Sequence, residues 1–359
     1  MEKKALIAMS GGVDSSVAAL LCQQAGFDCM GVTLKLYDNE DAGLPREKTC
    51  CSVDDVADAR SVAFRLGMPF YVFNFKEAFR REVMDRFVQA YERGETPNPC
   101  VDCNRYIKFE RLMRRGEEVG FPYIATGHYA RVEFDGAAGR WLLKKGLDEN
   151  KDQSYMLWSL TQWELSRLLL PLGGLTKERV RQLAEEHGFL NARKRDSQDI
   201  CFVPDGDYAA FIRRYAGKEF PPGAFVGTQG QVYGQHKGII HYTVGQRKGL
   251  GLSFPQPMFV KELDVEKNRV VLAKAEELFS QEVIARDINL ISVESIPAPL
   301  RVKARVRYRQ KEQPATVLQT GPDELRVVFD QPQRAVTPGQ SLVLYDGDTV
   351  VGGGKIVRK

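Results

Sequence analysis

Ser10-Gly11-Gly12-Val13-Asp14-Ser15-Ser16 is the stretch of sequence that decides the fold of this chain. It follows a short apolar run, Ala5–Met9, which is typical of a buried strand, and it opens a helical pattern through Val17 and Leu20. A turn from strand to helix on paired glycines favours phosphate binding, because the glycines let a ligand approach the backbone and the helix start offers unpaired N–H groups. Asp14 beside an anion indicates a cation between them, which points to a nucleotide bound with magnesium.

The glycine loop differs from the two commoner nucleotide-binding loops. No Gly-Lys-Ser/Thr ends it, which excludes a Walker-type loop, and no third glycine stands where a dinucleotide fingerprint needs one. The loop resembles the PP-loop of ATP pyrophosphatases, which adenylate an oxygen of their substrate and release pyrophosphate. It therefore predicts ATP as the cofactor and leaves the substrate open.

Length and composition are typical of a globular protein with several domains. At 359 residues the chain is too long for one ordinary core, and we expect two or three domains. No apolar run is long enough to cross a membrane, and the N-terminal apolar segment is too short for a signal peptide, so we expect a cytoplasmic protein with no membrane partner. Seven cysteines in a reducing compartment argue against a disulfide framework. The net charge of +4 is compatible with an RNA partner.

Strands and helices alternate up to about Cys201. We expect strands at Ala5–Met9, Met30–Leu36, Phe70–Phe73 and Tyr123–Ala125, and helices at Val53–Leu66, Ala78–Tyr91 and Ile107–Val119. This order predicts a parallel sheet covered by helices on both faces. Ligands bind such sheets beyond the carboxyl ends of the strands, where the glycine loop and Thr126-Gly127-His128 both fall.

Turn signals dominate after a last helix expected at Tyr208–Tyr215. Short β-branched and aromatic runs at Ile239–Val244, Arg269–Leu272 and Val302–Tyr308 favour small antiparallel barrels. A break near Leu278–Ile284, after a turn at Ala275–Leu278, divides this half of the chain into two modules.

Three cysteines in polar loops are candidates for chemistry. Cys100 and Cys103 lie just before an expected helix, whose N-terminus lowers the pKa of a thiol, and Cys201 lies in a third polar loop. A structural zinc site needs a second pair, and the adjacent Cys50-Cys51 is an awkward chelator. Two readings stay open: three thiols that hold an iron–sulfur cluster, or two that transfer sulfur by persulfide and disulfide exchange.

One segment alternates basic and non-basic residues. In Arg301–Lys311 every odd position is Arg or Lys, and a strand would place these six cations on one face. A charge run is usually an ordinary solvated face. Six like charges without a carboxylate among them nevertheless favour an anionic partner, for which a phosphate backbone is the natural choice.

Six groups of residues, in order over nearly the whole chain, resemble the family of tRNA-specific 2-thiouridylases, MnmA (TrmU), of the N-type ATP pyrophosphatase (PP-loop) superfamily. These are Ser10–Ser16, Asn98-Pro99 with Cys103-Asn104, Ala125–Tyr129, Lys151–Tyr155, Ile200–Phe202 and Thr243–Gly251. The resemblance implies a HUP-like α/β parallel-sheet PP-loop ATPase domain over residues 1–204, followed by two small β-rich domains that bind tRNA. The central one would span 205–280 and the last, a β-barrel, 281–359.

The resemblance also implies a reaction. The family places sulfur at C2 of the wobble uridine in tRNAs for Lys, Glu and Gln, after ATP has adenylated the C2 oxygen. Sulfur from a donor protein or relay would arrive on Cys201, and Cys103 would act as the nucleophile that frees it by forming a disulfide with Cys201. We therefore expect a tRNA sulfurtransferase that binds the anticodon region of tRNA and uses ATP with Mg²⁺.

The other site residues follow from their positions in the family's motifs. ATP would be held by Ala8, Met9, Ser10, Gly11, Gly12, Val13, Asp14, Ser15, Leu34 and Gly127. The target base would lie near Asn98, Pro99 and Cys100. The tRNA would contact His128, Lys151, Asp152, Gln153, Arg307, Tyr308 and Gln340.

Cys100 departs from the family pattern. Better-known members carry aspartate at this position, and some relatives in the superfamily bind a four-iron cluster through three cysteines. Cys100, Cys103 and Cys201 are therefore also candidate ligands of a [4Fe-4S] cluster.

Two other functions stay open at the level of sequence. A PP-loop ligase that adenylates a small molecule would explain the glycine loop but would leave the two β-rich modules without a role. A nucleotide-gated RNA-binding protein without catalysis would explain the loop and the basic segment, but it would make Cys103 and Cys201 accidental.

Overall fold

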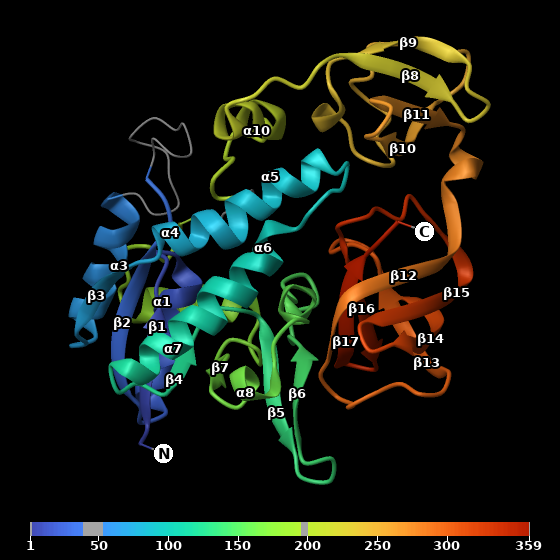
Figure 1. Cartoon of the computed structure of the whole chain (residues 1–359). Helices are drawn as coiled ribbons and strands as arrows, with labels where there is room; N and C mark the ends of the chain where they lie inside the picture. Colours follow the sequence, from blue (N-terminus) through green and yellow to red (C-terminus); the bar gives the residue numbers. More distant parts are fainter. Residues whose placement is uncertain (1, 39–52, 195–199, 359) are drawn as a thin grey trace. The chain divides into compact units, whose positions relative to one another are not determined.

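The computed structural model describes residues 2–38, 53–194 and 200–358, and so leaves out Cys50 and Cys51. The chain forms two compact units (Figure 1). The first consists of Met1–Val83, Cys100–Gly206 and Asp348–Val350, and the second of Met84–Pro99, Asp207–Gly347 and Val351–Lys359.

A parallel sheet lies at the centre of the first unit. Among the described residues its strand order is β3-β2-β1-β4-β7, and every pairing is parallel. The strands span Lys4–Ala8 (β1), Asp28–Lys35 (β2), Phe70–Asn74 (β3), Tyr123–Ala125 (β4) and Leu168–Leu169 (β7). The four predicted strands are confirmed, and the short edge strand β7 is additional.

The helices up to residue 194 lie between or after these strands in the sequence. They are α1 (Val13–Gln24), α3 (Val53–Arg65), α4 (Lys76–Phe79), α5 (Asp85–Glu92), α6 (Pro99–Asp102), α7 (Leu112–Glu118), α8 (Gln162–Leu165) and α9 (Lys177–Glu186), with a 3-10 turn η3 (Ser154–Leu157). The π-helical stretch η1 (Arg80–Met84) lies inside the predicted helix Ala78–Tyr91, and η2 (Cys103–Arg111) overlaps the start of the predicted helix Ile107–Val119. Because α6 runs into η2 without a break, the helix expected from Ile107 begins at Pro99. Cys100 and Cys103 therefore lie within the helix, and the expectation that they precede it was wrong.

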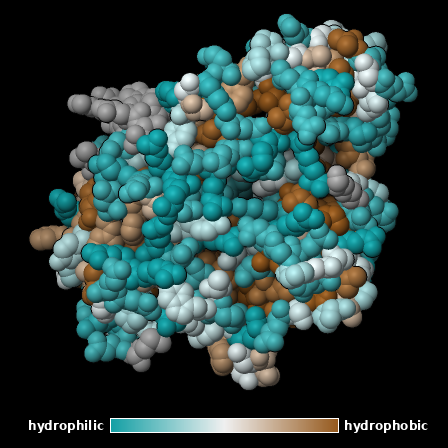
Figure 2. Space-filling model, viewed as in Figure 1, coloured by the Kyte–Doolittle hydropathy of each residue, from teal (hydrophilic) through white to brown (hydrophobic). Residues whose placement is uncertain are grey.

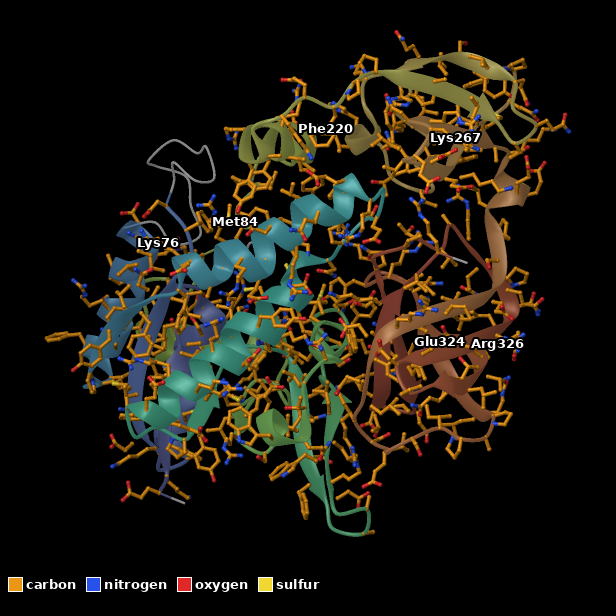
Figure 3. The ribbon with its side chains drawn as sticks, in the orientation of Figure 1. Lys76, Met84, Phe220, Lys267, Glu324 and Arg326 are labelled. Atoms are coloured by element: carbon orange, nitrogen blue, oxygen red, sulfur yellow. The ribbon has the colours of Figure 1, made fainter. Side chains whose placement is uncertain are left out.

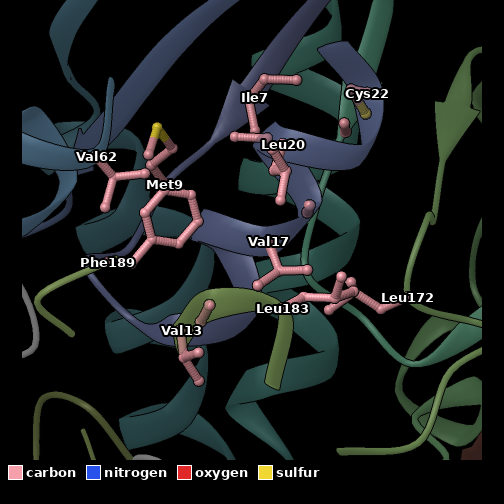
Figure 4. Packing of buried hydrophobic residues seen from close by; sticks show 14 of the residues in the cluster. Ile7, Met9, Val13, Val17, Leu20, Cys22, Val62, Leu172, Leu183 and Phe189 are labelled. Carbon is pink, nitrogen blue, oxygen red and sulfur yellow. The ribbon is translucent and has the colours of Figure 1, made fainter. Parts of the chain in front are cut away.

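Side chains of β1 alternate between the two faces of the sheet, as the period of two in a strand requires. Ile7 packs in one buried cluster with Val17 of α1 and Leu183 of α9 (Figure 4). Leu6 lies on the opposite face, where Gly116 of α7 approaches it. Helices therefore cover both faces of the sheet, and the predicted α/β architecture is confirmed.

A hairpin follows β4 that the sequence analysis did not predict. It pairs β5 (Ala130–Asp135) with β6 (Arg140–Lys145). Thr349, which belongs to the same unit, pairs with Lys144 of β6. Polar residues in both strands hide the hairpin from a search for apolar runs.

The second unit contains a small sheet with the order β10-β11-β8-β9. Its strands are Gly223–Gly227 (β8), Val232–His236 (β9), Phe259–Asp264 (β10) and Arg269–Ala273 (β11). Beside it α10 (Tyr208–Ala216) packs against α5 through aromatic rings, with the centroid of Phe87 6.0 Å from those of Tyr208 and Phe211 (Figure 1).

The β-branched run at Ile239–Val244 does not form a strand, so that expectation was wrong. Residues Ile239–His241 form a 3-10 turn, η4. Ile239 and Ile240 are both buried, so their apolar character reflects core packing and not strand pairing. A short apolar run does not distinguish these two cases.

Six strands close into an antiparallel barrel within residues 279–356, all of which are described. They are Phe279–Leu290 (β12), Leu300–Arg305 (β13), Gln313–Gly321 (β14), Glu324–Arg334 (β15), Ser341–Asp346 (β16) and Thr349–Ile356 (β17). The order is β12-β15-β14-β13-β16-β17, and β17 pairs back onto β12. The predicted C-terminal barrel is confirmed. The predicted turn is η5 (Ala275–Leu278), but the chain continues directly into β12 without a longer break.

Charged pairs line the outside of this barrel. Glu324 and Arg326 alternate with the buried Leu325 along β15 (Figure 3). Glu324 forms an ion pair of 2.9 Å with Arg286 of β12, and Arg326 forms one of 2.5 Å with Glu282 of the same strand. Opposite charges on neighbouring strands of this kind contribute modestly to pairing.

The described helices are all too short or too polar to span a lipid bilayer. Hydrophilic residues cover most of the face seen in Figure 2, and hydrophobic ones form separate small groups.

Candidate functional site

The glycine loop joins β1 to α1 at the carboxyl edge of the sheet. Gly11 has a φ of +75°, and a Cβ there would lie 2.4 Å from the backbone oxygen of Asp55 in α3, so only glycine fits. The Ser10 N–H donates to the Ser15 hydroxyl at 3.2 Å, and that hydroxyl donates to the carbonyl of Gly12 at 3.0 Å. Gly12 begins the helix without a side-chain cap in this fully described stretch, which leaves the first turn of α1 open to an anion.

Two side chains from distant segments hold the carboxylate of Asp14. The Lys177 ammonium lies 2.7 and 2.8 Å from its two oxygens, and the Tyr129 hydroxyl donates to Oδ1 at 2.7 Å. The Lys177 side chain is 11% exposed and that of Asp14 is 29% exposed. The sequence analysis predicted neither partner. One feature of the sequence could have pointed to Lys177. It is the first residue of the helix α9, and the helix dipole disfavours a cation at that end.

The predicted ATP contacts come together around this loop. A Cβ on Gly127 would lie 2.8 Å from the Ser15 nitrogen and from the carbonyl carbon of Asp14, so the end of β4 touches the first turn of α1. Met9 accepts a hydrogen bond from Thr33 of β2, whose next residue is the predicted contact Leu34. The edge therefore combines the ends of β1, β2 and β4.

Asn191 and Lys194 are site residues that the sequence analysis missed. The Asn191 amide donates to the carbonyl of Gly11 at 2.9 Å, and Lys194 forms two ion pairs of 2.6 Å with Asp55 and Asp58 of α3. Residues 191–194 are thus fastened to the glycine loop and to its neighbouring helix α3. No local pattern marks such long-range contacts in the sequence.

His128 is buried beside the same edge. Its Nδ1 lies 2.7 Å from the Thr126 hydroxyl, and its ring centroid lies 5.8 Å from that of Phe109. Burial, and then the positive charge of Lys108, holds the pKa of His128 well below its usual range. The ring is therefore neutral at pH 7 and suited to hydrogen bonding, not to ion pairing with phosphate.

Cys103 is the first residue of η2 and is 8% exposed. Burial raises the pKa of its thiol to about 11, and the positive charge of Lys108 opposes this only in part. Cys100, one helical turn earlier, is exposed. A buried thiol and an exposed one therefore stand side by side in Cys100-Val101-Asp102-Cys103, and π-helical stretches such as η2 occur frequently at functional sites.

The Cys201 loop is tied to the end of β2. The Tyr37 hydroxyl donates to the carbonyl of Cys201 at 2.6 Å. Phe202 packs on Phe79 of α4, which also contacts the ring of Tyr37, with centroid distances of 5.7 and 5.8 Å. Residues 195–199, which precede Ile200 and Cys201 in the sequence, lie outside the described residues.

The three candidate cluster ligands do not form a metal site in this structure. Among the described residues no three His, Cys, Asp or Glu side chains come together as a metal-binding group, although Cys100, Cys103 and Cys201 are all described. The donor set as arranged does not fit a [4Fe-4S] cluster.

Two predicted tRNA contacts make hydrogen bonds within the first unit. Asp152 accepts from the backbone and hydroxyl of Ser154, and Gln153 accepts from the Tyr129 N–H at 3.0 Å. Lys151 is half-buried in the turn before them. This loop thereby positions Tyr129, the residue that binds Asp14.

The predicted tRNA contacts in the second unit are also engaged with the backbone. Gln340 donates to the carbonyl of Thr96 at 2.7 Å, and Arg307 donates to the carbonyl of Arg334. Tyr308 is half-buried in the turn after β13. Their contact with tRNA stays a prediction.

The basic segment is not one continuous strand, so that part of the sequence analysis was wrong. β13 ends at Arg305, and residues 306–312 form a turn. Arg301 is ion-paired with Asp330 at 2.7 Å, and Arg305 with Glu312 at 2.8 Å. Asp330 of β15 and Glu312, the residue directly after the run, therefore supply the carboxylates that the run itself lacks. Three other cations of the run, Lys303, Arg309 and Lys311, are exposed and have no ion-pair partner among the described residues.

Comparison with known proteins covers almost the whole chain. The sequence model described as the tRNA methyl transferase HUP domain matches residues 3–205. The tRNA methyl transferase PRC-barrel domain matches 209–274, and the aminomethyltransferase beta-barrel domain matches 280–356. The tRNA-specific 2-thiouridylase MnmA of Clostridioides difficile is 50% identical over 358 residues, which is 100% of this chain and 99% of the relative. This chain belongs to the 2-thiouridylase family.

Other relatives agree with this assignment. The tRNA-specific 2-thiouridylase MnmA of Acetivibrio thermocellus is 50% identical over 99% of both chains, and that of Carboxydothermus hydrogenoformans is 49% identical over 99% of this chain and 98% of its own. Among solved structures, a 4-thiouridine synthetase–RNA complex with bound ATP matches 60% of this chain and 50% of its own, with 19% identity and a TM-score of 0.37.

Proposed function

We propose that this chain transfers sulfur to C2 of a tRNA uridine in an ATP-dependent reaction. The main support for the proposal is membership of the 2-thiouridylase family over the full length of the chain. In addition, the glycine loop and the loop that contains Cys201 lie at the same edge of the parallel sheet. A small-molecule ligase would not need the two β-rich modules matched by the family. A non-catalytic RNA-binding protein would not need Cys103 and Cys201.

ATP would bind with its phosphates at the first turn of α1. The open N–H groups there favour an anion, and Gly127 lets the end of β4 approach that turn closely because it carries no side chain. Asp14 offers a partly exposed carboxylate, the type of oxygen donor that Mg²⁺ accepts beside phosphate oxygens and water. Bound there, the metal would neutralise charge on the phosphates during adenylation.

The two cysteines would handle the sulfur. A donor protein or relay brings sulfane sulfur as a persulfide of its own; the Cys201 thiolate attacks the outer sulfur, the donor leaves as a thiolate, and Cys201 becomes the persulfide. The Cys103 thiolate then attacks the inner sulfur, that of Cys201. This forms a Cys103–Cys201 disulfide and releases hydrosulfide, which attacks C2 of the adenylated uridine and displaces AMP. A thiol reductant then supplies two electrons to return both cysteines to thiols. The wobble uridine of tRNAs for Lys, Glu and Gln is the proposed target, with Asn98, Pro99 and Cys100 near the base.

The test is reconstitution with an unmodified lysine tRNA, ATP, Mg²⁺, and a cysteine desulfurase with L-cysteine. We expect 2-thiouridine by mass spectrometry and pyrophosphate release that depends on tRNA. Cys103→Ser and Cys201→Ser should lose thiolation by about a hundredfold or more, because a hydroxyl neither forms a persulfide nor cleaves one. Both variants should keep pyrophosphate release, since adenylation uses no thiol.

Cys100→Ser separates the two mechanisms. If Cys100 only lies near the target base, the variant keeps much of its activity and anaerobically purified protein contains no stoichiometric iron. Loss of both iron and activity in this variant would favour the cluster. An active Cys103→Ser enzyme would contradict the sulfur-transfer scheme altogether.

A further inference from the structure

The position of Lys177 is not explained by the stability of the helix α9. It is the first residue of α9, and a cation at a helix N-terminus opposes the helix dipole. Its side chain is 11% exposed, so most of it, including much of the ammonium's hydration, is removed from water. The helix end is already capped without it, since Thr176 accepts from the Arg179 N–H and Asp148 accepts from the Lys177 N–H.

The ammonium is held against the glycine loop, whose open helix N-terminus favours phosphates. It contacts both oxygens of Asp14, two residues into α1 from Gly12. Asp14 is the more exposed partner, and the ammonium lies within 2.8 Å of both its oxygens, so a ligand that reaches the carboxylate also comes close to the ammonium. A lone carboxylate at this position would repel a polyphosphate, and Lys177 removes that repulsion.

The carboxylate has a second donor that can keep it in place. The Tyr129 hydroxyl holds Oδ1 at 2.7 Å, and Tyr129 itself is fixed through Gln153. The Lys177 ammonium also lies 5.9 Å from the centre of the Tyr129 ring. A lysine on a flexible four-carbon stem can therefore shift toward a new anion while Asp14 keeps one of its hydrogen bonds.

We propose that Lys177 is a phosphate-binding residue of the nucleotide site. In the chain without nucleotide it neutralises Asp14. In the complex its ammonium pairs with the phosphates of ATP and stays with the pyrophosphate that leaves, while Asp14 is free to hold the metal. This inference rests on the proposed use of ATP.

Pyrophosphate in the absence of metal is the best probe. Differences in its affinity between variants then cannot come from Mg²⁺ bound at Asp14. Binding is measured by calorimetry in EDTA, and folding by thermal unfolding. Lys177→Met should weaken pyrophosphate binding by about tenfold or more, the range for a hydrogen bond to a charged group. Asp14→Asn should strengthen it, because the competing carboxylate is gone. Lys144→Met is the matched control: it removes a lysine paired at 2.7 Å with Glu133 on the hairpin, and pyrophosphate binding should not change.

The double variant Asp14→Asn, Lys177→Met shows whether Lys177 only stabilises the fold through Asp14 or also binds phosphate. Lys177→Met alone leaves a carboxylate without its ion pair and lowers the melting temperature; the double variant should recover most of that loss. If Lys177 binds phosphate, pyrophosphate binding stays weak in the double variant. Recovery of binding together with stability would overturn the proposal, as would unchanged binding in Lys177→Met. Wild-type protein that neither binds ATP nor thiolates tRNA would instead contradict the proposed function.

Discussion

Cys103 shows at the scale of one residue how the fold opposes the chemistry proposed for it. The proposed reaction needs a thiolate, but burial favours the neutral thiol and raises its pKa to about 11. Lys108 is the positive charge that acts in the opposite direction. The same lysine lowers the pKa of His128, so it influences both side chains.

The pKa of Cys103 can be tested through its alkylation rate. A thiolate is the reactive form, so the logarithm of the rate rises by about one per pH unit until the pKa is reached. For native Cys103 this rise should continue past pH 9 toward 11, whereas in denaturant it should level off near pH 8.5. Timed iodoacetamide treatment followed by fragment-ion mass spectrometry resolves this cysteine from Cys100, which shares its tryptic peptide, and from the other cysteines. Lys108→Met should slow the native reaction at a given pH, and Lys108→Arg should not; a native plateau below pH 9 would contradict the buried thiol.

At the scale of elements, the site depends on one close approach between β4 and α1. Gly127→Ala would place a Cβ 2.8 Å from the Ser15 nitrogen, which must push the strand end away from the loop. We expect a loss of about 1–3 kcal/mol in stability, typical of overpacking, and a larger relative loss of ATP affinity. Gly174→Ala is the control, because a Cβ there meets nothing within 4 Å and should leave melting temperature and ATP binding unchanged. Equal behaviour of the two variants would show that the approach does not matter for the site.

Elements with a strong local signal could be predicted, and contacts between distant segments could not. The apolar β1 and the glycine loop are recognisable within a dozen residues, and Tyr123–Ala125 is β4 as expected. The strand predicted at Ile239–Val244 was wrong because a buried 3-10 turn needs the same apolar side chains as a buried strand, here Ile239 and Ile240. Lys177 meets Asp14 across 163 positions of sequence, and nothing near either residue encodes the other.

At the scale of the whole molecule, ion pairs redistribute the charge that the sequence suggests. The alternating run from Arg301 was expected to present six cations on one strand face. The strand stops at Arg305, however, and two of the cations pair with carboxylates outside the run, Asp330 on β15 and Glu312 directly after Lys311. Period-two patterning describes a strand only while the backbone stays extended. A turn within the run and acidic residues elsewhere in the chain, Asp330 among them, lie beyond what a local pattern contains.

The exposed cations make a distinct prediction for tRNA binding. The triple variant Lys303→Gln, Arg309→Gln, Lys311→Gln should weaken binding. It should also reduce the slope of log K against log salt by about 0.7–0.9 for each phosphate that the protein no longer neutralises. The measurement is a titration of fluorescent tRNA at several salt concentrations. A control triple, Arg286→Gln, Arg301→Gln, Arg326→Gln, removes the same net charge from cations already paired with Glu324, Asp330 and Glu282. Because those partners compete with phosphate, the control slope should change much less; equal slopes would mean that total charge, and not these three residues, governs binding.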